Sequence, residues 1–148
     1  MKRVLVLHGE TPSKFTWEAD RATFLLFGDA GSATALERAP GHKASFVLHT
    51  DGTGADDLVV RAGGFRDRWN EDRRKHHLEM NGANLFTFTI KRVAPLISDT
   101  AEQHGVALGD VDLFVLHQSN RFMMMHVAKK LALPESKLPM TLAEYGNT

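Results

Sequence analysis

Cysteine and long apolar segments are missing from this sequence. Without cysteine, these 148 residues hold neither a disulfide bond nor a thiol nucleophile, and the absence fits a reducing compartment. Near the start, the apolar run Val4 to Leu7 ends after four residues at His8, which is too short for the core of a signal peptide. No stretch reaches the roughly 20 apolar residues that a membrane-spanning helix needs. We therefore expect a soluble, cytoplasmic protein.

An excess of charge of either sign is also lacking, because 18 basic residues balance 18 acidic ones. A neutral chain creates no overall field that attracts nucleic acid or an anionic membrane, so any anion binding has to be local. The composition is ordinary for a globular protein, with 43% hydrophobic and 24% charged residues. A length of 148 residues suits one domain with a packed core.

Short apolar runs bounded by turn signals predict that the first third of the chain is largely β-strand. The run from Val4 to Leu7 is continuous, as in a strand covered on both faces. The glycines of Gly28-Asp29-Ala30-Gly31 suit a tight turn between two further strands. The predicted strands are 4–7, 22–27, 32–37, 44–49 and, later in the chain, 111–116.

Helical spacing appears after residue 80. Apolar side chains recur three and four positions apart in a first helix, which Pro95 is expected to kink or split near Ala94. A second helix is expected after the 111–116 strand, with Ser119 or Asn120 as its capping residue. The apolar stripe of the first helix comprises Phe86, Ile90, Val93 and Ile97, and that of the second comprises Met124, Val127, Ala128 and Leu131.

Residues 54–77 show little periodicity and mix basic with acidic side chains, which predicts an exposed excursion. The basic residues between Arg66 and Lys75 either belong to a solvated loop, the favoured interpretation, or contact phosphates or an acidic partner. His76 and His77 are adjacent and cannot easily present both rings to one metal, so we predict no metal site.

Two polar residues are candidates for holding a carbonyl oxygen. His117 follows the predicted strand 111–116, and Asn147 lies in Tyr145-Gly146-Asn147-Thr148. A neutral histidine donates from one ring nitrogen while the other is held, and an asparagine amide donates without titrating. Both residues also have structural interpretations: a histidine after a buried strand is often a satisfied structural residue, and asparagine tolerates a left-handed turn.

Two other motifs favour structural interpretations. Gly28-Asp29-Ala30-Gly31 lacks the lysine of a phosphate-binding loop and lies between two predicted strands, so a structural turn is the better interpretation. Met123-Met124-Met125 resembles an adaptable apolar surface, yet Met124 falls on the predicted core face. Core packing is therefore favoured for it.

Three motifs occur in an order that is typical of one family. They are Arg21-Ala22-Thr23 through Ala33, then His117-Gln118-Ser119-Asn120, then Tyr145 to Thr148, and Met80-Asn81-Gly82 leading into Phe86 is similar to a fourth segment. Together they resemble the β-ketoacyl-acyl carrier protein synthase III family of thiolase-like condensing enzymes. The family usually has Gly-Asp-Gly-Ala-Gly at the glycine turn and alanine after the glutamine, where this chain has Ser119.

The resemblance implies an α/β fold of the thiolase-like, layered αβαβα kind, here incomplete. In the family, a nucleophilic cysteine precedes the strand that corresponds to 4–7, and further elements follow the asparagine turn. We therefore expect an internal portion of a longer enzyme, although a degraded reading frame would look the same. Within one structural unit, residues 1–53 would end the N-terminal half, 54–79 would form a connecting excursion and 80–148 would begin the C-terminal half.

The resemblance also implies the chemistry. The parent enzyme would condense an acyl-coenzyme A primer with malonyl-acyl carrier protein in fatty acid biosynthesis, without a cofactor. A cysteine thiolate would hold the acyl group. His117 and Asn147 would donate to the enolate oxygen that forms when the malonyl thioester loses carbon dioxide. This chain alone is predicted to be inactive, since it lacks the cysteine.

By the same resemblance, Phe86, Ser119 and Asn120 would line the channel for the pantetheine arm. Phe86 also fits a core position, and Asn120 also fits a helix cap.

Arg121, Lys129 and Lys130 would dock the acidic acyl carrier protein. Lys129 and Lys130 also have a structural interpretation, because positive charges are favourable near the carboxyl end of a helix. The implied partners are acyl carrier protein, coenzyme A thioesters and a second copy in a homodimer, with no nucleic acid and no membrane. The alternatives are a noncatalytic partner subunit, or a related synthase of secondary metabolism with a different primer.

Overall fold

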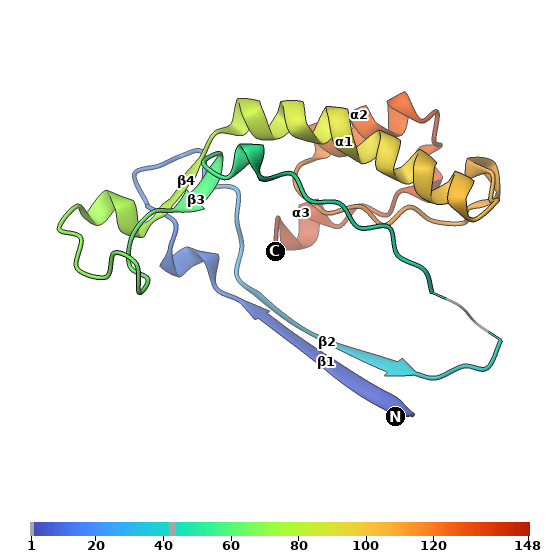
Figure 1. The fold of residues 1–148 in the computed structure, drawn as a ribbon, viewed down its shortest axis with the longest axis horizontal. Coiled ribbons are helices and arrows are strands. Elements are labelled where there is room, and N and C mark those ends of the chain that lie inside the picture. The colour runs from blue at the N-terminus through green and yellow to red at the C-terminus, as the bar shows by residue number, and fades with distance from the viewer. Residues whose placement is uncertain (1, 42–43) are drawn as a thin grey trace.

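The computed structural model describes residues 2–41 and 44–148, and in these residues two two-stranded antiparallel sheets and three α-helices are joined by loops and 3₁₀ turns (Figure 1). Strands β1 (Arg3–Glu10) and β2 (Ala30–Glu37) form a hairpin-like pair that we call the ribbon. Their register runs from Arg3 opposite Glu37 to Glu10 opposite Ala30. The ribbon lies apart from helices α1 and α2.

The predicted strands 4–7 and 32–37 are confirmed within the ribbon, but the expected burial of the first on both faces is wrong. Every residue of both strands is exposed, including Leu5 and Leu7, whose exposed fractions are 61% and 71%. Each strand finds its hydrogen-bond partner in the other, and no other described element packs extensively on either one. Backbone pairing and burial are therefore separate properties of this segment.

The predicted strand 22–27 is wrong, because residues 21–26 form turns and only Phe27 makes an isolated bridge. The carboxylate of Asp20 accepts hydrogen bonds from the Ala22 N–H at 3.0 Å and the Thr23 hydroxyl at 3.1 Å. Its carbonyl also accepts from the N–H groups of Thr23 and Phe24. An aspartate that binds the following backbone in this way favours a turn over a strand, despite the apolar residues that follow.

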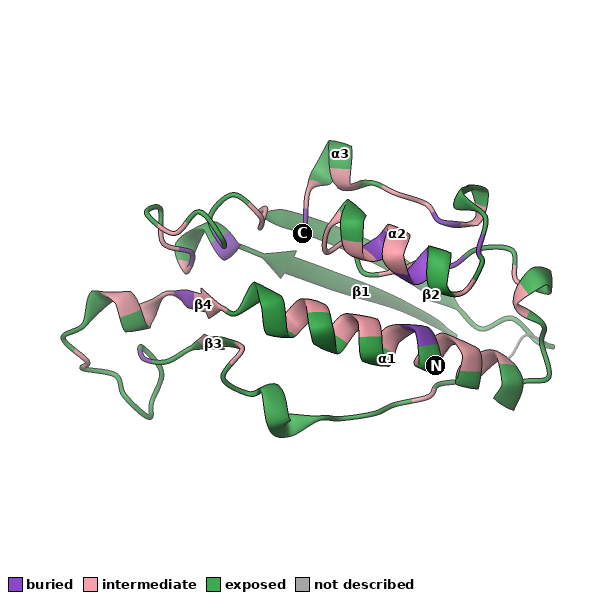
Figure 2. Cartoon of the chain, turned by 90° about the horizontal axis from the view of Figure 1, so that it is seen from above, coloured by how far each residue is buried: buried purple, intermediate pink, exposed green. Residues whose placement is uncertain are grey.

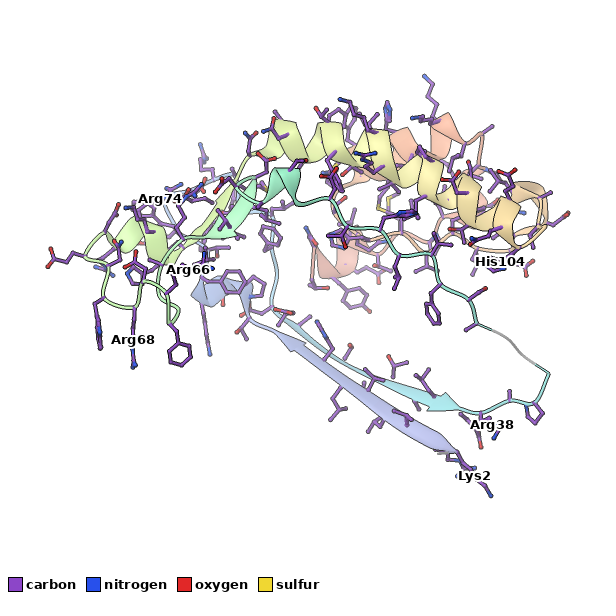
Figure 3. The ribbon with its side chains drawn as sticks, in the orientation of Figure 1. Lys2, Arg38, Arg66, Arg68, Arg74 and His104 are labelled. Carbon is purple, nitrogen blue, oxygen red and sulfur yellow. The ribbon has the colours of Figure 1, made fainter. Side chains whose placement is uncertain are left out.

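The excursion of residues 54–77 leads through strand β3 (Leu58–Val60) into strand β4 (Leu78–Met80), and the sequence predicted neither strand. These two strands pair antiparallel, with Val59 opposite Glu79. The loop between them is mostly exposed, as predicted, and Arg66 and Arg68 project from its end (Figure 3).

Helix α1 (Gly82–Gln103) begins at Asn81, whose side chain accepts a hydrogen bond from the Asn84 N–H at 3.2 Å. Pro95 lies inside this helix without splitting it, so the expected break is absent in α1. The predicted apolar stripe is half-buried, and the fully buried position on this helix is Ala94. None of the described helices is long and apolar enough to span a membrane.

Helix α2 (Arg121–Lys130) packs against α1. Buried residues alternate with exposed ones along α2 (Figure 2). Three residues of the predicted face of α2 are confirmed, because the exposed fractions of Met124, Val127 and Ala128 are only 1–2%. The fourth, Leu131, is half-buried and follows the last residue of the helix. The short helix α3 (Leu142–Tyr145) follows. A buried cluster that we call the helical core comprises Phe114, Ala128, Leu133 and Leu138.

The predicted strands 111–116 and 44–49 are not assigned as strands. Residues 111–116 instead lie beside residues 137–139: the Phe114 N–H donates to the Lys137 carbonyl at 2.8 Å, and the Lys137 ammonium donates to the carbonyls of Gly109 and Val111, both at 2.6 Å. A strand assignment requires a ladder of backbone partners, and among the described residues neither segment has one.

Candidate functional site

His117 stands at the end of the extended segment 111–116, in a tight bend. The carbonyl of His117 accepts a hydrogen bond from the Ser119 N–H at 2.9 Å. Its imidazole is exposed and makes no hydrogen bond to the described side chains or backbone. The structural interpretation of a buried, satisfied histidine therefore does not apply, and the ring is open to a ligand.

Asn147 is buried, with an exposed fraction of 6%, in the turn that follows α3. The left-handed residue of this turn is Gly146, whose φ is 72°, whereas Asn147 is not among the described residues with positive φ. The left-handed interpretation of Asn147 is therefore wrong. Since a glycine already supplies the unusual backbone conformation, the asparagine side chain is available for another role.

The Asn147 turn is held against the glycine motif near residue 28. Phe27 and Asn147 form a parallel β-bridge, and the Gly28 N–H donates to the Asn147 carbonyl at 2.9 Å. A side chain at Gly28 would meet the methyl group of Thr148 at 3.2 Å and the Tyr145 carbonyl at 3.4 Å. Gly28 thus permits a close approach of two distant segments.

The next residue, Asp29, anchors this region to the 3₁₀ turn at residues 12–14. Its carboxylate accepts hydrogen bonds from the Ser13 hydroxyl at 2.5 Å and the Ser13 N–H at 2.9 Å. These two bonds, the hydroxyl first, lower the pKa of Asp29 below its ordinary value of 3.8. The motif is structural, as predicted, but it leads from a turn region into β2, whose first two residues are Ala30 and Gly31, instead of joining two strands.

Ser119 and Asn120 form the entry to α2. The Asn120 side chain accepts from the Met123 N–H at 2.9 Å, which confirms the predicted cap. The Ser119 hydroxyl lies 3.8 Å from the Met123 sulfur. The oxygen of the Asn120 amide already caps the helix, and its nitrogen is a further donor that a substrate contact could use.

Phe86 belongs to the contact between α1 and α2. Its ring stacks on Phe122 with centroids 5.5 Å apart, and it meets the edge of His126 at 6.0 Å. Phe86 is half-buried by these contacts. The packing interpretation is thus supported by direct neighbours, and a channel role remains a prediction.

The three basic residues of α2 differ in their surroundings. All three are exposed, and a guanidinium nitrogen of Arg121 lies 3.5 Å from the Met140 sulfur. The Lys130 ammonium donates to the Ile90 carbonyl of α1 at 3.2 Å. Lys130 therefore ties the two helices together, while Lys129 is the better placed of the two lysines for a partner.

Within the arginine-rich excursion, Arg74 turns inward. Its guanidinium lies 4.6 Å from the centre of the Trp17 ring and 3.4 Å from the Asp20 carboxylate. His76 and His77 each place one ring nitrogen 2.8 Å from a backbone carbonyl. These contacts favour a structural interpretation for Arg74 and both histidines, whereas Arg66 and Arg68 remain on the outside (Figure 3).

A surface hollow of about 420 Å³ lies between the loop around Asp51 and helix α1. Neither His117 nor Asn147 lines it. An ion pair closes part of its wall, in which Arg92 lies 2.9 Å from Asp51. Its geometry therefore gives no support to a joint pocket for the two candidate donors.

Sequence reasoning missed Gln118. Its side chain forms hydrogen bonds to the backbone of residues 116, 139 and 141, which connects the His117 segment with the approach to α3. The glutamine follows His117 directly, but no periodicity or spacing in the sequence indicates which distant backbone groups it reaches.

Comparison with known proteins places these motifs in one family. The sequence model described as 3-oxoacyl-[acyl-carrier-protein (ACP)] synthase III matches residues 1–52, and the one for the C-terminal part of the same synthase matches residues 101–148. A β-ketoacyl-[acyl-carrier-protein] synthase III from Streptococcus gordonii is 36% identical over 97% of this chain and 45% of its own length. The chain thus spans about half the length of the curated relatives that it matches.

Solved structures agree with this comparison. A 3-oxoacyl-(acyl-carrier-protein) synthase III superposes with a TM-score of 0.93 at 36% identity, covering 99% of this chain and 48% of the other. A 3-oxoacyl-(acyl-carrier protein) synthase from Burkholderia xenovorans LB400 gives 0.88 at 42% identity, covering 99% and 44%. The expected α/β fold is confirmed as a fragment that matches about half of these thiolase-like structures.

Proposed function

Because the chain belongs to the 3-oxoacyl-[acyl-carrier-protein] synthase III family, we propose that it forms part of an enzyme that condenses an acyl-coenzyme A primer with malonyl-acyl carrier protein in fatty acid biosynthesis. The observation that carries this proposal is the convergence of the three motifs. Phe27 and Gly28 bind the Asn147 turn through the backbone, and Gln118, beside His117, binds the segment that leads into that turn.

The decarboxylation step defines what His117 and Asn147 have to do. The bond between the malonyl α-carbon and its carboxylate breaks, carbon dioxide leaves, and the electron pair forms an enolate whose charge lies on the thioester oxygen. Donors held in place before the reaction stabilise such a charge without reorganising. A ring N–H of His117 and the side-chain amide of Asn147 can each donate a hydrogen bond to this oxygen.

The second step requires a group that these residues do not contain. The enolate carbon attacks the carbonyl of an enzyme-bound acyl thioester, a carbon–carbon bond forms, and a thiolate is expelled. A cysteine is the usual carrier of such an acyl group, and the 148 residues include none. We place the nucleophile outside this chain and expect the chain alone to be inactive. Stable thioester labelling of the isolated chain by radiolabelled acyl-coenzyme A would contradict this assignment.

The donors are tested in the full-length protein. His117→Ala and Asn147→Ala are each expected to lower the rate of malonyl-thioester decarboxylation by about 10²–10³-fold, the usual loss for one donor to a developing oxyanion. His104→Ala and Asn84→Ala serve as matched controls. His104 lies just beyond the end of α1 (Figure 3), and the Asn84 side chain donates to the Asp57 carboxylate. Unchanged decarboxylation in both donor variants would refute the proposal.

Carrier-protein docking forms a separate part of the proposal. Arg121, Lys129 and Lys130 lie on α2, and an acidic carrier protein would be attracted by the exposed charges of the first two. Lys129→Glu is expected to raise the KM for malonyl-acyl carrier protein severalfold and to leave the KM for malonyl-coenzyme A unchanged. Lys91→Glu, an exposed lysine on α1, is the control. An equal effect on both substrates would remove Lys129 from the docking surface.

The remaining expectations extend the same proposal. Phe86, Ser119 and Asn120 line the pantetheine channel, and the enzyme is a cytoplasmic homodimer. Residues 1–53 end its N-terminal half, residues 54–79 form the connection, and residues 80–148 begin its C-terminal half. The separate family matches to residues 1–52 and 101–148 support this division. Analytical ultracentrifugation of the full-length protein tests the dimer, and a monomer at micromolar concentration would exclude it.

A further inference from the structure

Gln118 uses both ends of its side-chain amide. The nitrogen donates to the Leu116 carbonyl at 3.0 Å and to the Pro139 carbonyl at 3.3 Å. The oxygen accepts from the Thr141 N–H at 3.0 Å. The half-buried amide therefore acts as an additional peptide group between two segments that are separated by more than 20 residues.

The two segments that Gln118 joins carry the two proposed donors. Leu116 immediately precedes His117. Thr141 starts α3, where its carbonyl accepts from the N–H groups of Glu144 and Tyr145, each at 3.0 Å. This single helical turn leads directly to Gly146 and Asn147, so a shift of the Thr141 backbone would be passed on to the Asn147 turn.

Backbone pairing alone does not continue as far as this point. The Phe114 N–H binds the Lys137 carbonyl, but Pro139 has no N–H to extend a ladder. The N–H of Thr141, an exposed residue, finds its acceptor in the Gln118 side chain instead of in a backbone ladder. The Gln118 amide satisfies this donor and also binds the Pro139 carbonyl, a combination that neither glutamate as the anion nor methionine reproduces.

We propose that Gln118 is a positioning residue that holds the Asn147 turn in place relative to His117 for decarboxylation of the malonyl thioester. This inference rests on the proposed function, because it assigns Gln118 an effect that is exerted through the two donors. A misplacement of about 1 Å in a reactive site is sufficient to slow a reaction by roughly 10²-fold. Gln118 itself does not have to touch the substrate.

The test uses the full-length protein with Gln118→Met, which keeps the length of the side chain and removes its hydrogen bonds. Gln103→Met is the matched control, because Gln103 is the other glutamine of the chain and is exposed at the end of α1. We expect Gln118→Met to speed amide hydrogen exchange at Thr141 and to lower the kcat of decarboxylation about 10–100-fold, with KM changed less than about twofold. Gln103→Met is expected to change neither.

A double variant separates positioning from a general loss of structure. If Gln118 acts through Asn147, adding Gln118→Met to Asn147→Ala is expected to lower kcat by less than about twofold more, since coupled residues are not additive. The positioning role would be overturned if Gln118→Met lowered kcat in the Asn147→Ala background by the same factor as in the wild type. It would also be overturned if Gln118→Met alone raised KM and left kcat unchanged. If Gln118→Met leaves kcat intact while Asn147→Ala does not, the positioning role fails and the proposed function stands.

Failure of the proposed function gives a different pattern. Decarboxylation that is insensitive to both His117→Ala and Asn147→Ala would remove that function and the positioning role with it, whatever happens at Thr141. Where Gln118→Met does not fold, Gln118→Glu takes its place. Its protonated carboxyl keeps a donor and an acceptor, so its kcat relative to wild type is expected to rise as the pH falls, and a flat ratio would count against the inference.

Discussion

The ribbon and the helical core contain similar apolar side chains in opposite surroundings. Leu7 in β1 has an exposed fraction of 71%, whereas that of Leu138 in the helical core is 6%. The ribbon pairs β1 with β2 along the edges that face each other, but buries none of its residues. In the helical core, helix α2 and the segments around Phe114 and Leu138 satisfy backbone groups and exclude water together.

This difference shows that backbone pairing and hydrophobic burial contribute separately to the stability of the folded chain. Two strands alone give only marginal stability in water, since a hairpin needs a third strand or a packed layer. Exposed, apolar strand pairs are also prone to association. The ribbon therefore depends on covering by another surface, while the helical core holds its own apolar contacts.

The largest expected effect compares one leucine from each region in the 148-residue chain. Leu138→Ala is expected to lower the free energy of unfolding by about 2–5 kcal/mol, because it removes buried methyl groups and leaves a cavity. Leu7→Ala is expected to change it by less than about 0.5 kcal/mol, because the side chain is already in water. Urea unfolding followed by far-ultraviolet circular dichroism measures both values.

Equal losses in the two leucine variants would show that Leu7 is buried in solution. Sedimentation at several protein concentrations would then reveal whether copies of the chain cover one another's ribbons. A loss for Leu7→Ala that appears only in the full-length protein would mean that the rest of the enzyme covers the ribbon.

How much the sequence revealed also differs between the two regions. The buried face of α2 and the Asn120 cap were predictable, because both depend on neighbours within one or two helical turns. Residues 4–7 of β1 and 32–37 of β2 were predicted as strands from short apolar runs. Their exposure, however, depends on what packs against them. A continuous apolar run predicts a strand that can be buried, not the presence of a layer above it.

Errors arose where one polar residue or a missing partner decided the structure. Asp20 converts an apolar run into turns by binding the N–H of Ala22 and the hydroxyl of Thr23. The segment 111–116 has no ladder of partners among the described residues, and its Phe114 N–H donates to the Lys137 carbonyl. In the candidate site, His117 and Asn147 are predictions from the family motifs, whereas the contacts of Gln118 depend on a chain path that local patterns do not encode.

A second, smaller effect concerns the local signal on which the helical region depends. Asn120→Ala is expected to lower the free energy of unfolding by about 1 kcal/mol, because the Met123 N–H loses its capping acceptor. Asn120→Asp keeps an acceptor and adds a favourable charge at the helix start, so it is expected to be neutral or slightly stabilising. Thermal unfolding of the three proteins measures the difference, and equal stability of the alanine variant and wild type would show that the cap contributes nothing.

A smaller effect still is expected from the ion pair across the ribbon. The Arg3 guanidinium lies 3.0 Å from the Glu37 carboxylate, and both side chains are largely exposed. Exposed pairs contribute about 0–1 kcal/mol, and salt screens them. A double-mutant cycle with Arg3→Ala and Glu37→Ala is expected to give a coupling within that range that disappears in about 1 M salt. A larger coupling that survives salt would mean that the ribbon is shielded from water.

The smallest effect is a titration at the end of the ribbon where Asp29 binds Ser13. Because the folded pKa of Asp29 lies below its ordinary value of 3.8, this contact stabilises the fold above that value and is lost as the pH falls through the lowered pKa. Ser13→Ala removes the main cause, the hydroxyl bond, and is expected to raise the pKa of Asp29 toward 3.8. Carbon-13 NMR of the carboxyl groups follows the change.

Asp51 is the internal control for that titration, since Thr53 lowers its pKa in the same way at a different site. Ser13→Ala should leave the Asp51 titration unchanged. Below the lowered pKa, wild-type amides of β1 and β2 are expected to exchange faster while those of α2 keep their protection, because Asp29 joins only the ribbon to the 3₁₀ turn. Simultaneous loss of protection in both regions would mean that the ribbon and the helical core unfold as one cooperative unit.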